Sequence, residues 1–88
     1  MARVEWTKHA LEQLKSIPGN YRKAISEKIS MLQRYPALVA NLDIKKMAGG
    51  EGEFRMRVGD YRVIYIIENG EPVVITIQRI ARRTSTTY

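Results

Sequence analysis

The feature that most constrains this sequence is a pair of apolar segments joined by two turn residues. Residues 54–58 and 61–67 carry apolar side chains at alternate positions, a period of two that is typical of half-buried strands. Gly59-Asp60 between them fits a two-residue hairpin loop that begins with glycine. The segment therefore predicts an antiparallel hairpin whose register is set by its turn.

This register sorts the hairpin side chains onto two faces. The apolar set that would face the core is Phe54, Met56, Val58, Tyr61, Val63, Tyr65 and Ile67. The opposite face would carry Arg55, Arg57 and Arg62, together with Ile64 and Ile66. Arg57 would lie opposite Arg62, where like charges repel. Strand charges that merely prevent aggregation are the alternative explanation, but the opposed pair favours an anion site that binds phosphate bidentately. The two isoleucines on that face favour a protein partner that covers it.

Helical patterns precede the hairpin. Residues 4–6 predict a short strand, and Thr7 can cap a helix that ends at Pro18-Gly19. Asn20 can cap a second helix, which Pro36 closes. Residues 37–52 show no clean period and predict a loop. Two helices with so short a connection form an antiparallel pair.

The last strand is predicted at Val73–Arg79, with Ile67 opposite Val73 and Gln78 beside Arg62. Residues 80–88 then form a polar tail. The whole pattern predicts one α+β domain over residues 1–88, in which an N-terminal strand and a helical hairpin pack on one face of a small, mainly antiparallel sheet.

Composition excludes several kinds of chemistry. The 88 residues contain no cysteine and one histidine, which excludes thiolate sites and disfavours a multi-histidine metal site. We expect a cytoplasmic protein with no membrane partner, because no apolar run approaches the ~20 residues of a membrane span and no leader pattern begins the chain. The net charge of +6 favours nucleic acid or an acidic protein as partner.

The segments Lys45–Gly49 and Phe54–Tyr65 resemble the signature of RelE/ParE-superfamily toxins of type II toxin–antitoxin systems, and the resemblance spans essentially the whole chain. It implies one of two activities. The RelE branch cleaves mRNA in the ribosomal A site, whereas the ParE branch poisons DNA gyrase. Every basic position of the RelE branch is filled here, which favours a ribosome-dependent endoribonuclease. A gyrase poison or an inactive basic binding module is the alternative.

The resemblance also implies residue roles and partners. The implied catalytic residues are Arg55, Arg57, Arg62, Arg83 and Tyr88, with Arg82 as the neighbouring alternative to Arg83. The implied RNA-binding residues are Lys45, Lys46, Arg79 and Arg82. The implied reaction is attack of a ribose 2′-OH on the adjacent phosphate, which needs no metal or other cofactor. The expected partners are the ribosome with its A-site mRNA and a cognate antitoxin, acidic and partly disordered, in a hetero-oligomer.

Overall fold

The structure is a computed structural model that describes residues 2–34, 44–46 and 52–82. Its elements are β1 Arg3–Trp6, α1 Lys8–Ser16, α2 Gly19–Leu32, β2 Ile44–Lys46, β3 Glu53–Val58, β4 Tyr61–Glu68 and β5 Val74–Arg82. The strands form one sheet in the order β1-β5-β4-β3-β2. β1 runs parallel to β5, and the other neighbouring strands are antiparallel.

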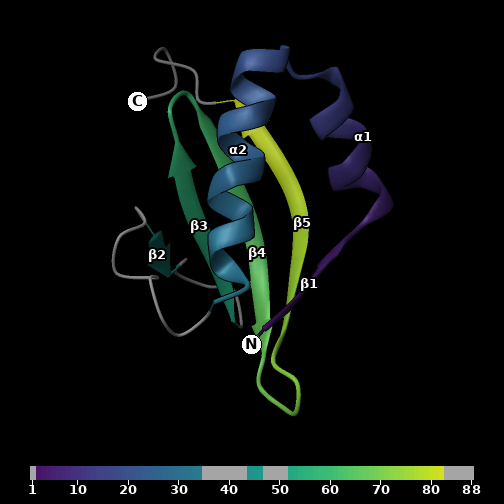
Figure 1. Cartoon of the computed structure of the whole chain (residues 1–88). Coiled ribbons are helices and arrows are strands. Elements are labelled where there is room, and N and C mark those ends of the chain that lie inside the picture. Colours follow the sequence, from purple (N-terminus) through teal and green to yellow (C-terminus); the bar gives the residue numbers. More distant parts are fainter. Residues whose placement is uncertain (1, 35–43, 47–51, 83–88) are drawn as a thin grey trace.

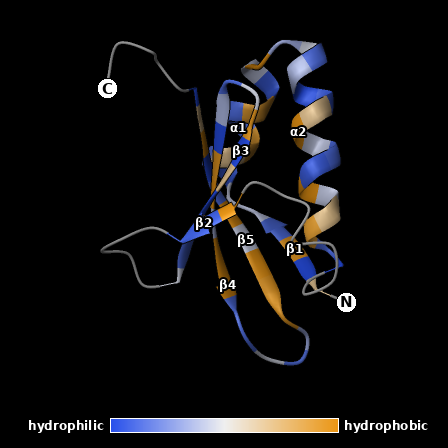
Figure 2. Ribbon diagram, turned by 90° about the vertical axis from the view of Figure 1, so that its left-hand side faces the viewer, coloured by the Kyte–Doolittle hydropathy of each residue, from blue (hydrophilic) through white to orange (hydrophobic). Residues whose placement is uncertain are grey.

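Both helices cover the same face of this sheet, so the predicted α+β architecture is confirmed. In Figure 1, α2 crosses in front of the central strands and α1 lies beside β5. In the perpendicular view of Figure 2, the helices stay on one side of the sheet and the hydrophobic segments of the central strands are plain. The other face of the sheet carries no helix from the described part of the chain.

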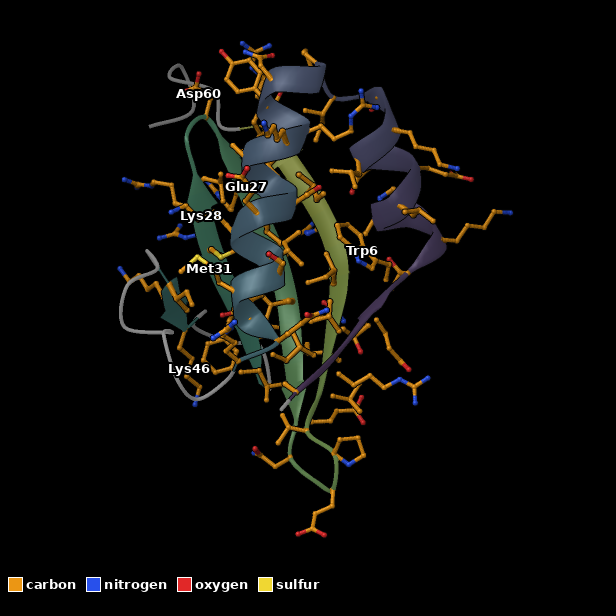
Figure 3. The ribbon with its side chains drawn as sticks, in the orientation of Figure 1. Trp6, Glu27, Lys28, Met31, Lys46 and Asp60 are labelled. Carbon is orange, nitrogen blue, oxygen red and sulfur yellow. The ribbon has the colours of Figure 1, made fainter. Side chains whose placement is uncertain are left out.

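The core lies between the helices and the sheet. Ile25 and Leu32 of α2 and Ala10 of α1 are buried against apolar side chains of the central strands. The buried sheet residues of this cluster are Met56, Val58, Tyr61, Val63, Tyr65, Ile75, Ile77 and Ile80. Trp6 packs partly buried against the cluster, between α1 and the sheet (Figure 3). Its predicted packing role is therefore confirmed.

The two helices begin for different reasons. Thr7 caps α1 as predicted, because its Oγ1 accepts a hydrogen bond from the N–H of Ala10 at 3.1 Å. The predicted Asn20 cap is wrong, since α2 already begins at Gly19 and Pro18 occupies the cap position without a side-chain hydrogen bond. Proline has a fixed φ and lacks the N–H that a helix start would leave unpaired, so it can begin a helix without such a bond. The predicted closure at Pro36 falls outside the described residues.

The hairpin register is confirmed. Val58 pairs with Tyr61 and Arg57 with Arg62, as a two-residue loop requires. Gly59 has φ +57°, a conformation that glycine adopts without a steric penalty from a Cβ atom.

One strand lies in a segment predicted as loop. Residues 44–46 form β2, which pairs with β3 so that Ile44 lies opposite Met56. Three residues are too few to show a period, and only Ile44 is apolar. The strand therefore forms because of its pairing with β3 rather than because of a pattern of its own.

The last strand pairs further along than predicted. Ile67 lies opposite Ile75 rather than Val73, a shift of two residues, and Ala81 rather than Gln78 lies opposite Arg62, a shift of three. A shift of two keeps side chains on the same faces, so alternation cannot reveal it, whereas the extra residue in the middle of the strand exchanges the faces of the residues that follow. The strand also continues to Arg82, so the start of the predicted polar tail at residue 80 is wrong.

Candidate functional site

Basic side chains from four neighbouring strands share the face of the sheet that the helices leave uncovered. Because Met56, Val58 and Val63 are buried toward the helices, the residues that alternate with them lie on the opposite side. We call this set the arginine face, and its members are Lys45 of β2, Arg55 and Arg57 of β3, Arg62 of β4 and Arg79 of β5.

The strand register brings these cations close together. Lys45 lies directly opposite Arg55, and Arg57 lies directly opposite Arg62. Cβ atoms of directly opposed residues in an antiparallel pair are about 4.5–5.5 Å apart, and diagonal neighbours remain within reach of long side chains. Several positive charges are therefore concentrated on one surface, an arrangement that can bind successive phosphates of a nucleic acid.

The members of the arginine face differ in exposure. Arg57 and Arg79 are exposed, whereas Arg55 and Arg62 are half-buried. The Nε atom of Arg62 is itself buried. A guanidinium held partly inside the protein loses less side-chain freedom when it binds an anion. Arg62 is thus the best placed of these arginines to present a preorganised charge, and Arg57 beside it is exposed to solvent.

Ile64 lies among these arginines and corrects one expectation. Its side chain was predicted to be exposed, but only 1% of the residue is accessible, although it lies outside the main core cluster. Its direct cross-strand neighbours are Arg55 and Arg79. Arginine stems are apolar and can cover such a side chain while their charged ends stay in water. The burial of Ile64 therefore requires no additional protein partner, and Ile66 is half-buried.

Glu53 is a residue of this face that the sequence reasoning missed. It lies two positions before Arg55 on β3 and opposite Ile66, so its carboxylate belongs to the same side of the sheet. The alternation along β3 was the signal that could have found it. It places a negative charge at the end of the arginine face that is distant from the β3–β4 turn.

Two predicted RNA-binding residues are placed elsewhere. Lys46 lies opposite Phe54 and Arg82 opposite Tyr61, and these are register positions of the helix-covered face. Lys46 and Arg82 are both exposed, and Figure 3 shows Lys46 beside β2. The structure thus brings Lys45 and Arg79 to the arginine face but not Lys46 or Arg82. Arg83 and Tyr88 lie outside the described residues.

Two further properties of the described residues concern metals and membranes. Within residues 2–34, 44–46 and 52–82, no three His, Asp or Glu side chains are grouped so that they could hold a metal ion. Neither α1 nor α2 combines the length and apolar character that crossing a bilayer requires.

Comparison with known proteins places this geometry in a context. The sequence model of the ParE toxins of the type II toxin–antitoxin system parDE matches residues 4–85. The toxin RelE3 of Methanocaldococcus jannaschii is 37% identical over 84 residues, which cover 94% of this chain and 92% of that protein.

Two solved structures are also similar over most of their length. One is the archaeal RelE–RelB complex from Pyrococcus horikoshii OT3, with a TM-score of 0.78 and 30% identity over 96% of this chain and 97% of that chain. The other is the RelB–RelE antitoxin–toxin complex from Methanococcus jannaschii, with a TM-score of 0.73 and 33% identity over 93% of each chain.

Proposed function

The chain belongs to the RelE/ParE superfamily of type II toxins, and from this premise we propose that it is a ribosome-dependent endoribonuclease that cleaves mRNA in the A site. The relatives that match over nine-tenths of the chain carry RelE names, which favours this branch. The observation that carries the proposal is the direct opposition of Arg57 and Arg62 within the arginine face. Like charges so arranged disfavour each other, and a bound phosphate relieves the repulsion.

In the proposed reaction, a ribose 2′-OH attacks the adjacent phosphorus and the 5′-oxygen of the next nucleotide leaves. The products are a 2′,3′-cyclic phosphate and a free 5′-hydroxyl. Negative charge concentrates on the phosphate oxygens in the transition state, where preorganised cations stabilise it. Arg62 and Arg83 have this role in our proposal. No metal ion is required, because guanidinium groups supply the positive charge.

The remaining residues bind and orient the RNA. Arg55 and Arg57 position the backbone next to the scissile phosphate, and Tyr88 stacks on a base. Lys45 and Arg79 contact the outer phosphates from the arginine face, and the exposed Lys46 and Arg82 add positive charge beyond it. Guanidinium groups stay protonated in proteins and are therefore weak proton acceptors. Such a site depends on the ribosome to hold the 2′-OH in line with the leaving oxygen, because alignment then lowers the barrier.

The test is translation of a defined mRNA by purified ribosomes, with cleavage sites mapped by primer extension. We expect cuts within the A-site codon and none in the same mRNA without ribosomes. Intact mRNA on stalled ribosomes after addition of the folded protein would contradict the proposal. The name of the matching family model favours a second candidate, a gyrase poison. A DNA supercoiling assay with purified gyrase distinguishes the two, since the nuclease leaves supercoiling unchanged.

We also propose an acidic antitoxin as the protein partner in the cytoplasm. Both similar structures described above are RelE–RelB complexes, and this chain carries a net charge of +6. A partly disordered acidic chain can wrap a basic protein of this size and meet its cations with carboxylates.

A further inference from the structure

Strand β5 changes register in its middle. From Val74 to Ile77 it pairs with β4 in one register, and from Arg79 onward in another, so that Tyr65 lies opposite Ile77 and Ile64 lies opposite Arg79. Gln78 is therefore an extra residue, a β-bulge. A bulge of one residue exchanges the two faces for all residues that follow it.

This exchange decides which side chains reach the arginine face. Without the bulge, the first register would continue and Arg79 would lie opposite Val63, a core residue with no accessible surface. Ile80 would then lie opposite Arg62, on the arginine face. The bulge instead buries Ile80, which is 4% accessible, and places the exposed Arg79 beside Ile64.

Thr7, which caps α1, and Gln13 of α1 form hydrogen bonds with the backbone of β5 at the bulge. β1 ends at Trp6, so it cannot pair with β5 beyond Ile77. The N–H of Thr7 donates to the carbonyl of Ile77 at 3.0 Å, and the Thr7 hydroxyl donates to the carbonyl of Gln78 at 3.0 Å. Further along, Gln13 Oε1 accepts from the N–H of Ile80 at 2.7 Å. Backbone groups at a bulge that lacked such partners would cost stability.

We propose that Thr7 and Gln13, the bulge anchor, are positioning residues that hold Arg79 on the arginine face. They lie on the helix side of the sheet and act through the backbone of β5 rather than on RNA. Thr7 is fixed in turn by the N–H of Ala10, which donates to the same hydroxyl. The consequence for mRNA cleavage rests on the proposed function, but the effect on β5 does not.

The first measurement is amide hydrogen exchange followed by NMR. In the parent protein, the Ile80 amide should exchange slowly although β1 does not extend along β5 as far as Ile80. Replacing Gln13 with leucine (Gln13→Leu) removes the acceptor at similar size and should accelerate exchange of the Ile80 amide at least about tenfold relative to that of Val63. Gln13→Glu keeps an acceptor oxygen and should preserve protection. Glu12→Gln, on an exposed neighbour in α1, is the matched control.

Either of two results would contradict the proposed role of the bulge anchor. One is an Ile80 amide in the parent that exchanges as fast as an exposed loop amide, a measurement that needs no variant to fold. The other is unchanged Ile80 exchange in folded Gln13→Leu. A cross-strand nuclear Overhauser effect between Ile64 and Arg79 reports the register directly, and we expect Gln13→Leu to weaken it and Gln13→Glu to restore it.

The second measurement is cleavage of ribosome-bound mRNA under single-turnover conditions. Gln13→Leu should slow the cleavage step about tenfold, which corresponds to one mispositioned cation, while Gln13→Glu restores it. Parental cleavage in a Gln13→Leu protein with an unprotected Ile80 amide would refute the positioning role and leave the nuclease proposal standing. A parent protein that cleaves no mRNA would refute the nuclease proposal. The exchange measurement would still show whether Gln13 protects the Ile80 amide.

Discussion

Arg57 of β3 and Arg62 of β4 are direct cross-strand neighbours, yet the first is exposed and the second half-buried. The pair follows from the two-residue turn at Gly59-Asp60, which leaves the register no freedom. Because the two side chains differ in burial, they present their charges differently. Arg62 presents its charge from within the sheet, whereas Arg57 reaches toward solvent. A phosphate placed between them meets one fixed cation and one adaptable cation.

The first prediction concerns Arg62→Ala. We expect a loss of A-site cleavage of about 100-fold, the scale seen when one preorganised donor is removed from a transition-state site. The free energy of unfolding should change by less than about 1 kcal/mol, because Arg62 lies outside the core and its removal relieves repulsion with Arg57.

The control for this prediction is Arg22→Ala, which removes the same charge from an exposed position on α2. It should retain cleavage within about twofold of the parent, because an exposed cation on a helix that covers the other face of the sheet adds little. Cleavage rates and urea denaturation of both variants check the prediction. Equal cleavage losses in the two variants would mean that net charge, rather than the arginine face, governs activity.

The second prediction concerns the turn. Gly59→Ala should lower the free energy of unfolding by about 1–2 kcal/mol, because Gly59 has φ +57° and an L-residue is disfavoured there. A Cβ atom at this position meets nothing within 4 Å, so the cost is conformational rather than a clash. Gly59→Asn should cost less, since asparagine tolerates this region.

Gly70→Ala is the matched control for the turn. Its φ is not in the positive range, and a Cβ atom there makes an ordinary contact, 3.6 Å from the carbonyl oxygen of Pro72. Its unfolding midpoint in urea should stay at or slightly above that of the parent. Equal destabilisation by the two alanine substitutions would show that the Gly59 backbone does not carry the cost.

The third prediction tests the length of β5. Ile80→Ala should reduce the free energy of unfolding by about 2–5 kcal/mol, the range for a truncated core isoleucine, because Ile80 is 4% accessible. Leu11→Ala is the comparison, since Leu11 is 41% accessible and should cost less than about 1 kcal/mol. Thermal denaturation of both variants is sufficient. Similar small costs would place Ile80 in a tail rather than in the core.

The parts of the fold that sequence reasoning predicted are those with strong local signals. The hairpin register followed from the loop length between Val58 and Tyr61, and the Thr7 cap from a hydroxyl placed just before a helical pattern. The opposition of Arg57 and Arg62 followed directly from that register. This relationship, the centre of the candidate site, was therefore predictable from the sequence.

The parts that were missed depend on contacts between distant segments. The two-residue shift of the first part of β5 preserves the faces. The backbone at the Gln78 bulge is hydrogen-bonded by Thr7 and Gln13, more than sixty positions earlier. Neither leaves a local pattern. The strand at residues 44–46 likewise depends on β3 for its pairing. For the site, the predicted register would have put Arg79 opposite Tyr61, a residue of the core face, and the bulge that the sequence does not reveal places it opposite Ile64 on the arginine face.

The fourth prediction concerns the acidic antitoxin. Its association rate with this chain should fall at least about tenfold between low and high salt, because opposite charges steer the encounter and salt screens them. The dissociation rate should change much less, since contacts made after docking determine it. Surface plasmon resonance across a salt series, with the product of the adjacent gene as the ligand, checks both rates. An association rate that is flat across the series would contradict electrostatic steering.

A matched pair of variants then shows where the antitoxin binds. Arg57→Gln and Arg22→Gln remove one charge each, from the arginine face and from α2 respectively, so they should slow association to a similar extent. If the antitoxin covers the arginine face, Arg57→Gln should also accelerate dissociation several-fold, because a charge-assisted contact is lost in the complex. If the antitoxin instead prevents entry to the A site by its bulk, the two variants should dissociate at the same rate. Neutralisation by coverage thus requires the dissociation rates to differ.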